Sequence, residues 1–211
     1  MQVAVKYPSV LLAHAQRGDC VQQLARDLSA QVATILSLQA RASLLLPGGS
    51  SPQQLLPLLA AEPLEWARVD VSPTDERWVA ANAEQSNWRL LQQSLPAAAC
   101  LDPRQADSAQ ASASLWADQL QARMPFAAVL LGMGEDGHIA SLFPGMPGLA
   151  PALDLQAAPS ALCAQAPSEP RQRLSLNLAL LLQTQWLGLL AFGQSKKQLI
   201  DAVLADMPQS R

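Results

Sequence analysis

One of the two histidines in this sequence of 211 residues, His138, has the chemistry of a general acid or base. It lies in a glycine-flanked turn that directly follows an apolar run ending at Leu131. Imidazole titrates near neutral pH, so a histidine exposed in a crevice can take a proton from water and later return it to a leaving group. Asp136, two residues earlier, could hold the ring in position. The alternative is a histidine at the start of a helix that makes only a structural hydrogen bond.

A second segment with recognisable chemistry is Gly48-Gly49-Ser50-Ser51, which joins an apolar run to a predicted helix. Its backbone N–H groups, its two hydroxyls and the positive end of the helix could together receive an anion such as a phosphate monoester. It is not a Walker loop, because no Gly-Lys-Ser/Thr sequence follows it. The alternative is a tight turn in which Ser51 caps the helix.

Two cations, Arg77 and Lys196, are predicted to lie beyond the ends of strands. A phosphate that carries nearly two negative charges needs such partners in a partly desolvated site. Asp75 and Glu76 could orient Arg77, or they could cap the segment that follows. Both cations could also be ordinary surface residues, and the sequence pattern leaves these alternatives open.

The pattern of histidines and cysteines does not indicate a metal site. His138 has no partner histidine in its stretch, and His14, in a separate helix-like segment, is assigned to structure. The three cysteines, Cys20, Cys100 and Cys163, are widely separated and include no CxxC pair, which is typical of reduced thiols. We therefore expect no metal site among these residues, and separately we expect no cofactor.

Predicted strands and helices alternate along the chain and must position these residues. The run 42–46 is apolar on both faces, which suits a strand covered by helices on each side, and Asp19 and Ser51 have the form of helix starts. The alternation predicts an α/β fold with a doubly wound, mostly parallel sheet and helices on both faces. We expect strands at 42–46, 66–71, 126–131 and 187–192, helices at 19–38, 51–61, 84–95, 115–124 and 195–204, and long connections at 97–113 and 143–170.

The ends of the predicted strands bring the polar segments together. In open α/β sheets, ligands bind in the crevice outside the carboxyl ends of the strands. Four polar segments each follow a predicted strand, so parallel strands would place all four on one rim of the sheet. These segments are 48–51, 75–77, 134–138 and 193–196.

Composition and charge exclude several classes of protein. Half of the residues are hydrophobic, 15% are charged and the formal net charge is −3, with no basic cluster longer than Lys196-Lys197. No apolar stretch approaches the roughly 20 residues that a membrane-spanning helix needs, and the first residues lack an export pattern. We expect a cytoplasmic protein with a single domain over 1–211, a monomer or weak homo-oligomer, with no nucleic-acid or membrane partner.

Several motifs, in this order, resemble the 6-phosphogluconolactonase family, which belongs to a superfamily with glucosamine-6-phosphate deaminases. They are PGGSSP at 47–52, TDERWV at 74–79 with SN at 86–87, LLGMGEDGHIASLFPG at 130–145, RLSLN at 173–177 and GQSK at 193–196. The resemblance implies a Rossmann-like fold. It also implies a metal-independent carboxylic ester hydrolase that opens the small molecule 6-phospho-D-glucono-1,5-lactone to 6-phosphogluconate in the oxidative pentose phosphate pathway.

The resemblance further assigns roles to individual residues. It implies that His138 is the general base and that Asp75 and Asp136 are active-site carboxylates. Arg171 lies two residues from Arg173 and is the alternative to it as a phosphate ligand. The phosphate-binding residues that the resemblance implies are Gly48, Gly49, Ser50, Arg77, Arg173 and Lys196.

Two other functions compete with this interpretation. An amino-sugar-phosphate deaminase/isomerase would share the glycine-serine loop and the lysine, and ammonia release from glucosamine 6-phosphate would reveal it. A non-catalytic sugar-phosphate sensor would bind 6-phosphogluconate without accelerating lactone opening.

Overall fold

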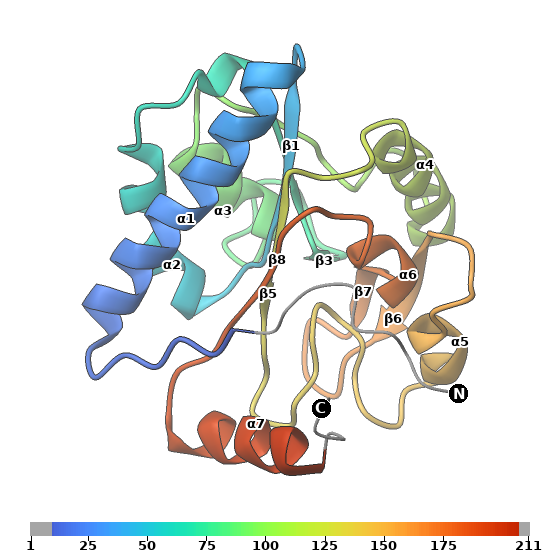
Figure 1. Cartoon of the computed structure of the whole chain (residues 1–211). Coiled ribbons are helices and arrows are strands. Elements are labelled where there is room, and N and C mark those ends of the chain that lie inside the picture. The colour runs from blue at the N-terminus through green and yellow to red at the C-terminus, as the bar shows by residue number, and fades with distance from the viewer. Residues whose placement is uncertain (1–9, 207–211) are drawn as a thin grey trace.

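The computed structural model describes residues 10–206, and a five-stranded parallel sheet forms its centre (Figure 1). The order of the strands is β4-β2-β1-β5-β8, and every pair of neighbours is parallel. The predicted α/β fold class is therefore confirmed. The strands are β1 (Ala42–Leu46), β2 (Val69–Pro73), β4 (Ala99–Cys100), β5 (Ala128–Gly132) and β8 (Leu187–Leu190).

The strand order fixes where a ligand crevice can form. The chain starts in the middle of the sheet at β1, builds β2 and β4 on one side, and then returns to build β5 and β8 on the other. The connections that leave β1 and β5 consequently diverge at their carboxyl ends, which opens a crevice there. The glycine-serine loop follows β1, and the turn with His138 follows β5.

Helices cover both faces of the parallel sheet (Figure 1). On one face lie α1 (Arg17–Leu38), α2 (Ser50–Ala60) and α3 (Asn87–Ser94), and on the other lie α4 (Ala109–Gln121) and α6 (Leu178–Leu181). The short helix α5 (Leu149–Leu153) packs near α6, and α7 (Gln194–Asp206) follows β8.

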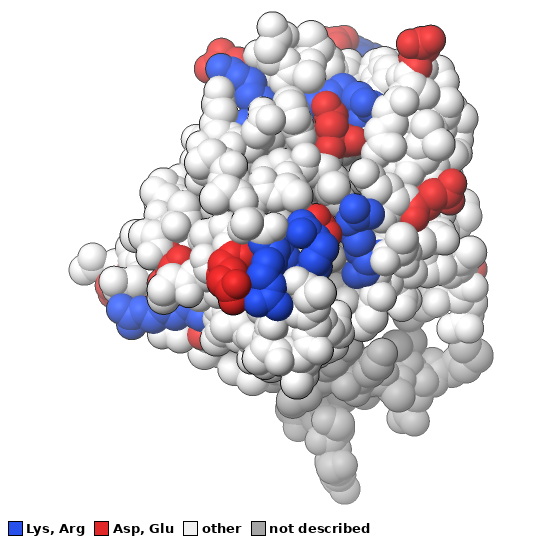
Figure 2. All heavy atoms as spheres, turned by 90° about the horizontal axis from the view of Figure 1, so that it is seen from above, with Lys and Arg blue, Asp and Glu red and all other residues white. Residues whose placement is uncertain are grey.

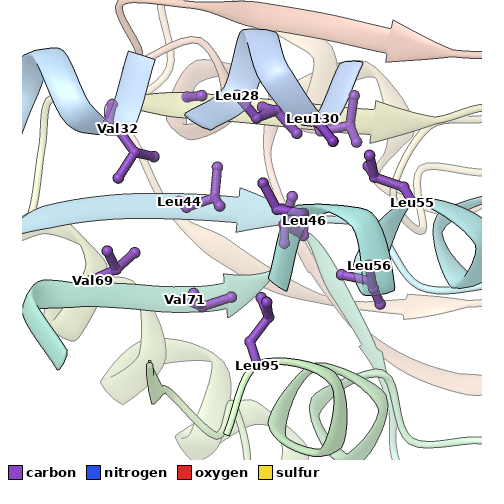
Figure 3. Packing of buried hydrophobic residues seen from close by; sticks show 14 of the residues in the cluster. Leu28, Val32, Leu44, Leu46, Leu55, Leu56, Val69, Val71, Leu95 and Leu130 are labelled. Atoms are coloured by element: carbon purple, nitrogen blue, oxygen red, sulfur yellow. The ribbon is translucent and has the colours of Figure 1, made fainter. Parts of the chain in front are cut away.

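The packing of strand β1 explains why every residue from Leu44 to Leu46 is apolar. Leu44 and Leu46 pack with Leu28 of α1 and Leu55 of α2, as Figure 3 shows. The intervening Leu45 faces the opposite cluster, which includes residues of α4. Both faces of the strand are thus buried, as the predicted covering by helices requires.

A second, antiparallel sheet lies beside the first and was not predicted from the sequence. Its order is β3-β7-β6, with β3 at Asp75–Arg77, β7 at Gln172–Leu176 and β6 at Ala161–Gln165. The segment 143–170, predicted as a long connection, contains β6 and α5. Its short elements are only partly buried, so they lack the apolar periodicity that identifies longer ones.

Several predicted boundaries are wrong. Helix α4 begins six residues before the predicted start, within the expected connection 97–113, because Ser108 caps it by accepting a hydrogen bond from the Ala111 N–H. Residues 66–68 form a 3₁₀ turn, η1 (Trp66–Arg68), rather than part of a strand. Helix α1 begins at Arg17, so Asp19 lies in its first turn, and His14 lies before the helix.

The surface of the described residues carries charges of both signs. On the face shown in Figure 2, acidic and basic side chains lie beside one another in a largely uncharged surface, without a continuous basic patch. Among residues 10–206, no helix is long and apolar enough to span a bilayer. Cys20, Cys100 and Cys163 are free thiols, and burial raises the pKa of Cys100 to about 11.

Candidate active site

A pocket of about 300 Å³ lies where the carboxyl ends of β1 and β5 diverge, and it brings together the predicted site residues. Asp136 does not line it but contacts His138, which does. The strand-end rule thus predicted the location of the pocket correctly. The predicted residues that line the pocket are Gly48, Gly49, Ser50, Asp75, Arg77, His138, Arg173 and Lys196.

The glycine-serine loop presents the start of α2 to the pocket. Helix α2 begins at Ser50, and its N-cap is Gly49, whose φ of 98° is in the left-handed region that favours glycine. No described side chain caps this helix, and its N-cap is Gly49 rather than Ser51, so the predicted cap by Ser51 is wrong. The N–H groups of the first turn therefore keep their hydrogen-bonding capacity at the positive end of the helix.

Two arginines meet at the pocket from neighbouring strands. Arg77 on β3 lies directly opposite Arg173 on β7, and Arg173 is only 7% exposed. Arg77 donates to the Gln85 carbonyl, yet the Nε atoms of both arginines are buried without a hydrogen-bond partner in the described structure. Burial and the neighbouring Arg77 lower the pKa of Arg173, although nearby carboxylates oppose this. Such a pair of cations suits an anion with two negative charges.

The structure distinguishes Arg171 from Arg173, the two arginines that the sequence offers as phosphate ligands in this region. Arg171 is exposed and pairs with Glu169, at 3.2 Å between Nε and Oε1, and it does not line the pocket. The side chain of Arg173 instead reaches the pocket from the middle of the antiparallel sheet. Of the two, only Arg173 is therefore placed to meet a ligand there.

Lys196 enters the pocket from the first turn of α7. Its Nζ lies 3.5 Å from Oε1 of Glu135, while the Ser195 hydroxyl donates to the other oxygen of the same carboxylate. The hydrogen bond from Ser195 and then the charge of Lys196 lower the pKa of Glu135. Glu135 thus connects the histidine turn to the helix that carries the lysine.

His138 is held by Asp136 in the same turn. The Nδ1 atom of the ring lies 2.5 Å from Oδ1 of Asp136, and the ring packs against Phe143 with a centroid distance of 4.4 Å. Burial raises the pKa of Asp136, but the hydrogen bonds from His138 outweigh this effect and leave the pKa below its ordinary value. An ionised Asp136 accepts the Nδ1 proton, which leaves Nε2 as the basic nitrogen of the neutral ring.

This arrangement of the histidine requires a glycine at position 134. A Cβ atom on Gly134 would lie 2.2 Å from both Cε1 and Nδ1 of His138 and 2.7 Å from Oδ1 of Asp136. The turn also uses Gly137, whose φ is 84°. The glycines of the motif therefore let the ring and its carboxylate partner lie directly against the backbone.

The two acidic residues of β3 have different surroundings. Asp75 lines the pocket, and its Oδ2 accepts a hydrogen bond of 2.6 Å from the Ser141 hydroxyl. Glu76 is fully buried and accepts from the backbone N–H groups of Arg77 and of the first residues of α3. Burial raises the pKa of Glu76, while hydrogen bonds and Arg104 act in the opposite direction. Glu76 thus both caps α3 and holds the backbone at Arg77.

The sequence prediction missed several uncharged residues of the pocket. Asn87, Ser141, Phe143 and Ser168 also line it. None carries a charge or a titratable group that singles it out by type. Asn87, Ser141 and Phe143 do lie within the strings SN and LLGMGEDGHIASLFPG, so those motifs held a signal for them.

The sequence matches a family model and several known proteins. The family model described as glucosamine-6-phosphate isomerases/6-phosphogluconolactonase matches residues 15–211. The chain is 38% identical over 210 residues to a 6-phosphogluconolactonase of Pseudomonas putida, covering 95% of this chain and 86% of that protein. It is 40% identical over 199 residues to a 6-phosphogluconolactonase of Pseudomonas aeruginosa, covering 89% and 83%.

Solved structures show the same architecture. A 6-phosphogluconolactonase from Shewanella baltica superposes with a TM-score of 0.82 at 30% identity, covering 90% of this chain and 84% of that one. A monomeric glucosamine-6-phosphate deaminase superposes with a TM-score of 0.72 at 16% identity, covering 94% and 88%. The second likeness concerns the fold alone.

Proposed function

The chain belongs to the glucosamine-6-phosphate isomerase/6-phosphogluconolactonase family, and we propose that it is a 6-phosphogluconolactonase. Its reaction is the opening of 6-phospho-D-glucono-1,5-lactone to 6-phosphogluconate. One observation supports this proposal most strongly: a pair of arginines without ion-pair partners among residues 10–206 and a histidine held by a carboxylate line the same pocket. The names of the relatives cited above point to the same reaction.

In this proposal the phosphate of the lactone binds between the start of α2 and the cations. The N–H groups after Gly49 donate to its oxygens, and Arg77, Arg173 and Lys196 balance its charge. A bound phosphate would give the buried Nε atoms of the two arginines the hydrogen-bond partner that they lack among the described residues. Anchoring the phosphate places the lactone ring toward His138.

His138 then acts as the general base. Its Nε2 removes a proton from a water molecule whose oxygen attacks the lactone carbonyl carbon. The bond between that carbon and the ring oxygen breaks, and the imidazolium returns the proton to the departing ring oxygen. Asp136 holds the ring through Nδ1 and stabilises the imidazolium while it exists.

A coupled assay tests the reaction. Glucose-6-phosphate dehydrogenase generates the lactone in the cuvette, and formation of 6-phosphogluconate is followed with and without this protein. The proposal expects opening faster than the spontaneous rate. A rate equal to that of the buffer alone would contradict it.

The same preparation distinguishes the two competing functions. A deaminase/isomerase would release ammonia from glucosamine 6-phosphate, and we expect none. A sensor would bind 6-phosphogluconate in calorimetry without accelerating lactone opening, and we expect both binding and acceleration.

A further inference from the structure

Asn87 lies in the pocket, but the proposed reaction assigns it no role. It is the first residue of α3, it is 2% exposed, and it lines the pocket between the glycine-serine loop and Asp75. A buried carboxamide must satisfy its hydrogen bonds, so its contacts indicate what it does.

The donor side of the carboxamide holds Asp75. The Nδ2 atom of Asn87 donates to the Asp75 carbonyl oxygen at 2.8 Å and lies 3.4 Å from Oδ1 of the same residue. The backbone N–H of Asn87 donates at 2.8 Å to the buried Glu76 carboxylate, which fixes the start of α3. Glu76 therefore fixes the backbone of Asn87, and the side chain of Asn87 in turn fixes Asp75, which lines the pocket.

The acceptor side of the carboxamide lies against the glycine-serine loop. A Cβ atom on Gly48 would lie 1.8 Å from Oδ1 of Asn87 and 2.2 Å from its Cγ. Gly48 is not among the glycines with a left-handed φ, so its backbone conformation does not demand glycine. The need for glycine at position 48 comes from the close approach of Asn87.

We propose that Asn87 is a positioning residue that sets the spacing between the glycine-serine loop and the Asp75 carboxylate. The inference rests on the proposed function, because that spacing must match the distance from the phosphate to the sugar ring. A ligand that has both a phosphate and a sugar, such as 6-phosphogluconate, requires the correct spacing between the glycine-serine loop and Asp75. Inorganic phosphate requires only the loop and the cations.

The first test compares these two ligands in the variant Asn87→Ala. We expect the affinity for 6-phosphogluconate to fall about tenfold or more and the affinity for inorganic phosphate to change less than about threefold, by titration calorimetry. The turnover number for the lactone should fall by up to about 100-fold, because small displacements of a bound substrate cost rate. Equal losses of affinity for both ligands would overturn the proposal.

A matched control is available at Asn177. It is also buried, at 3% exposed, and it caps α6 by accepting from the Leu180 N–H, but it does not line the pocket. Asn177→Ala should lower the melting temperature and leave the ratio of the two affinities unchanged. A changed ratio in this variant would mean that any loss of a buried asparagine has the effect, which would also overturn the proposal.

The second test uses the contact with Gly48. Gly48→Ala alone forces Asn87 aside, so we expect 6-phosphogluconate to bind about tenfold more weakly and the melting temperature to fall. In the Asn87→Ala background the three atoms nearest to that Cβ are absent, so adding Gly48→Ala should cost less than about threefold in affinity and lower the melting temperature little further. Additive effects would show that the two residues are not coupled and would overturn the inference.

The outcomes separate this inference from the proposed function. The coupling between positions 48 and 87 is read in the melting temperature as well, which needs no substrate. If the wild-type protein fails in the lactone assay but the two substitutions are coupled and the ligand ratio shifts, the reaction is wrong and the positioning role stands. If the lactone assay succeeds and the substitutions are additive, only the positioning role is wrong.

Discussion

Arg77 and Arg173 lie directly opposite each other on two antiparallel strands, and within residues 10–206 neither forms an ion pair. Burial and then the charge of Arg77 lower the pKa of Arg173, as expected when two guanidinium groups lie close together and partly away from solvent. We expect a bound anion to relieve this unfavourable juxtaposition of two cations.

Inorganic phosphate should consequently stabilise the fold. At about one hundred times its dissociation constant, a ligand that binds only the folded state adds about 2.7 kcal/mol. For a chain of this size, that raises the melting temperature by about 5 to 10 °C, which differential scanning fluorimetry measures. In Arg173→Met the rise should shrink to a small fraction, whereas Arg171→Met, which removes an exposed arginine outside the pocket, should keep it.

Replacing His138 by alanine should reduce turnover while leaving binding largely intact. General base assistance is worth about 10² to 10⁴ in rate, and the proposal gives His138 no part in holding the phosphate. Stopped assays of lactone opening give the rate, and calorimetry with 6-phosphogluconate gives the affinity. His14→Ala is the matched control, since His14 is exposed and outside the pocket. A loss of affinity as large as the loss of rate would contradict the division of roles.

Lys196→Ala should mainly raise the Michaelis constant for the lactone, by about tenfold or more, because a charge-assisted contact to the phosphate is lost. The neighbouring Lys197 pairs with Asp201 on the exposed side of α7, so Lys197→Ala should leave the kinetics near those of the wild type. A fall in turnover without a change in the Michaelis constant would assign Lys196 to the chemical step instead.

The acid limb of the stability curve should depend on Asp136. Burial raises its pKa, but the hydrogen bonds from His138 outweigh this and leave the pKa below its ordinary value, so the folded state favours the carboxylate. The stability that it contributes is present above the unfolded pKa and is lost as the pH falls through the lower folded value. Urea unfolding between about pH 2 and 6 should show a shallower acid loss for Asp136→Asn. The exposed Asp107→Asn serves as the control, and an unchanged acid slope in the Asp136 variant would contradict the prediction.

The elements of the parallel sheet could be predicted because their residues are buried on both faces. Leu44, Leu45 and Leu46 are each apolar whichever side they face, so the run is recognisable without knowledge of its neighbours. Strand β3 gives no such signal, since Asp-Glu-Arg becomes a strand only through its pairing with β7, almost one hundred residues away. The start of α4 was missed because small residues, Ala109, Ser112 and Ala113, form its buried face.

The residues of the candidate site also fall into two groups, those that the sequence pattern could predict and those that depend on unpredicted contacts. His138 and the glycine-serine loop could be predicted from residue type and from their places after strands. Arg173 came only from the family resemblance, because its role depends on the antiparallel sheet that the sequence pattern did not reveal. Asn87 was missed because its importance lies in a contact with Gly48, 39 positions earlier in the sequence, that neither residue type indicates.

Helix α7 has thirteen residues, and none of them is buried. It gains little from apolar burial, so its attachment depends on polar contacts near its first turn, where Glu135 meets Ser195 and Lys196. An anion held by Lys196 adds a further tether at that same end. When the pocket is occupied, the backbone amides of α7 should therefore exchange their hydrogens more slowly. Amide exchange in α7 would then serve as a local measure of ligand binding.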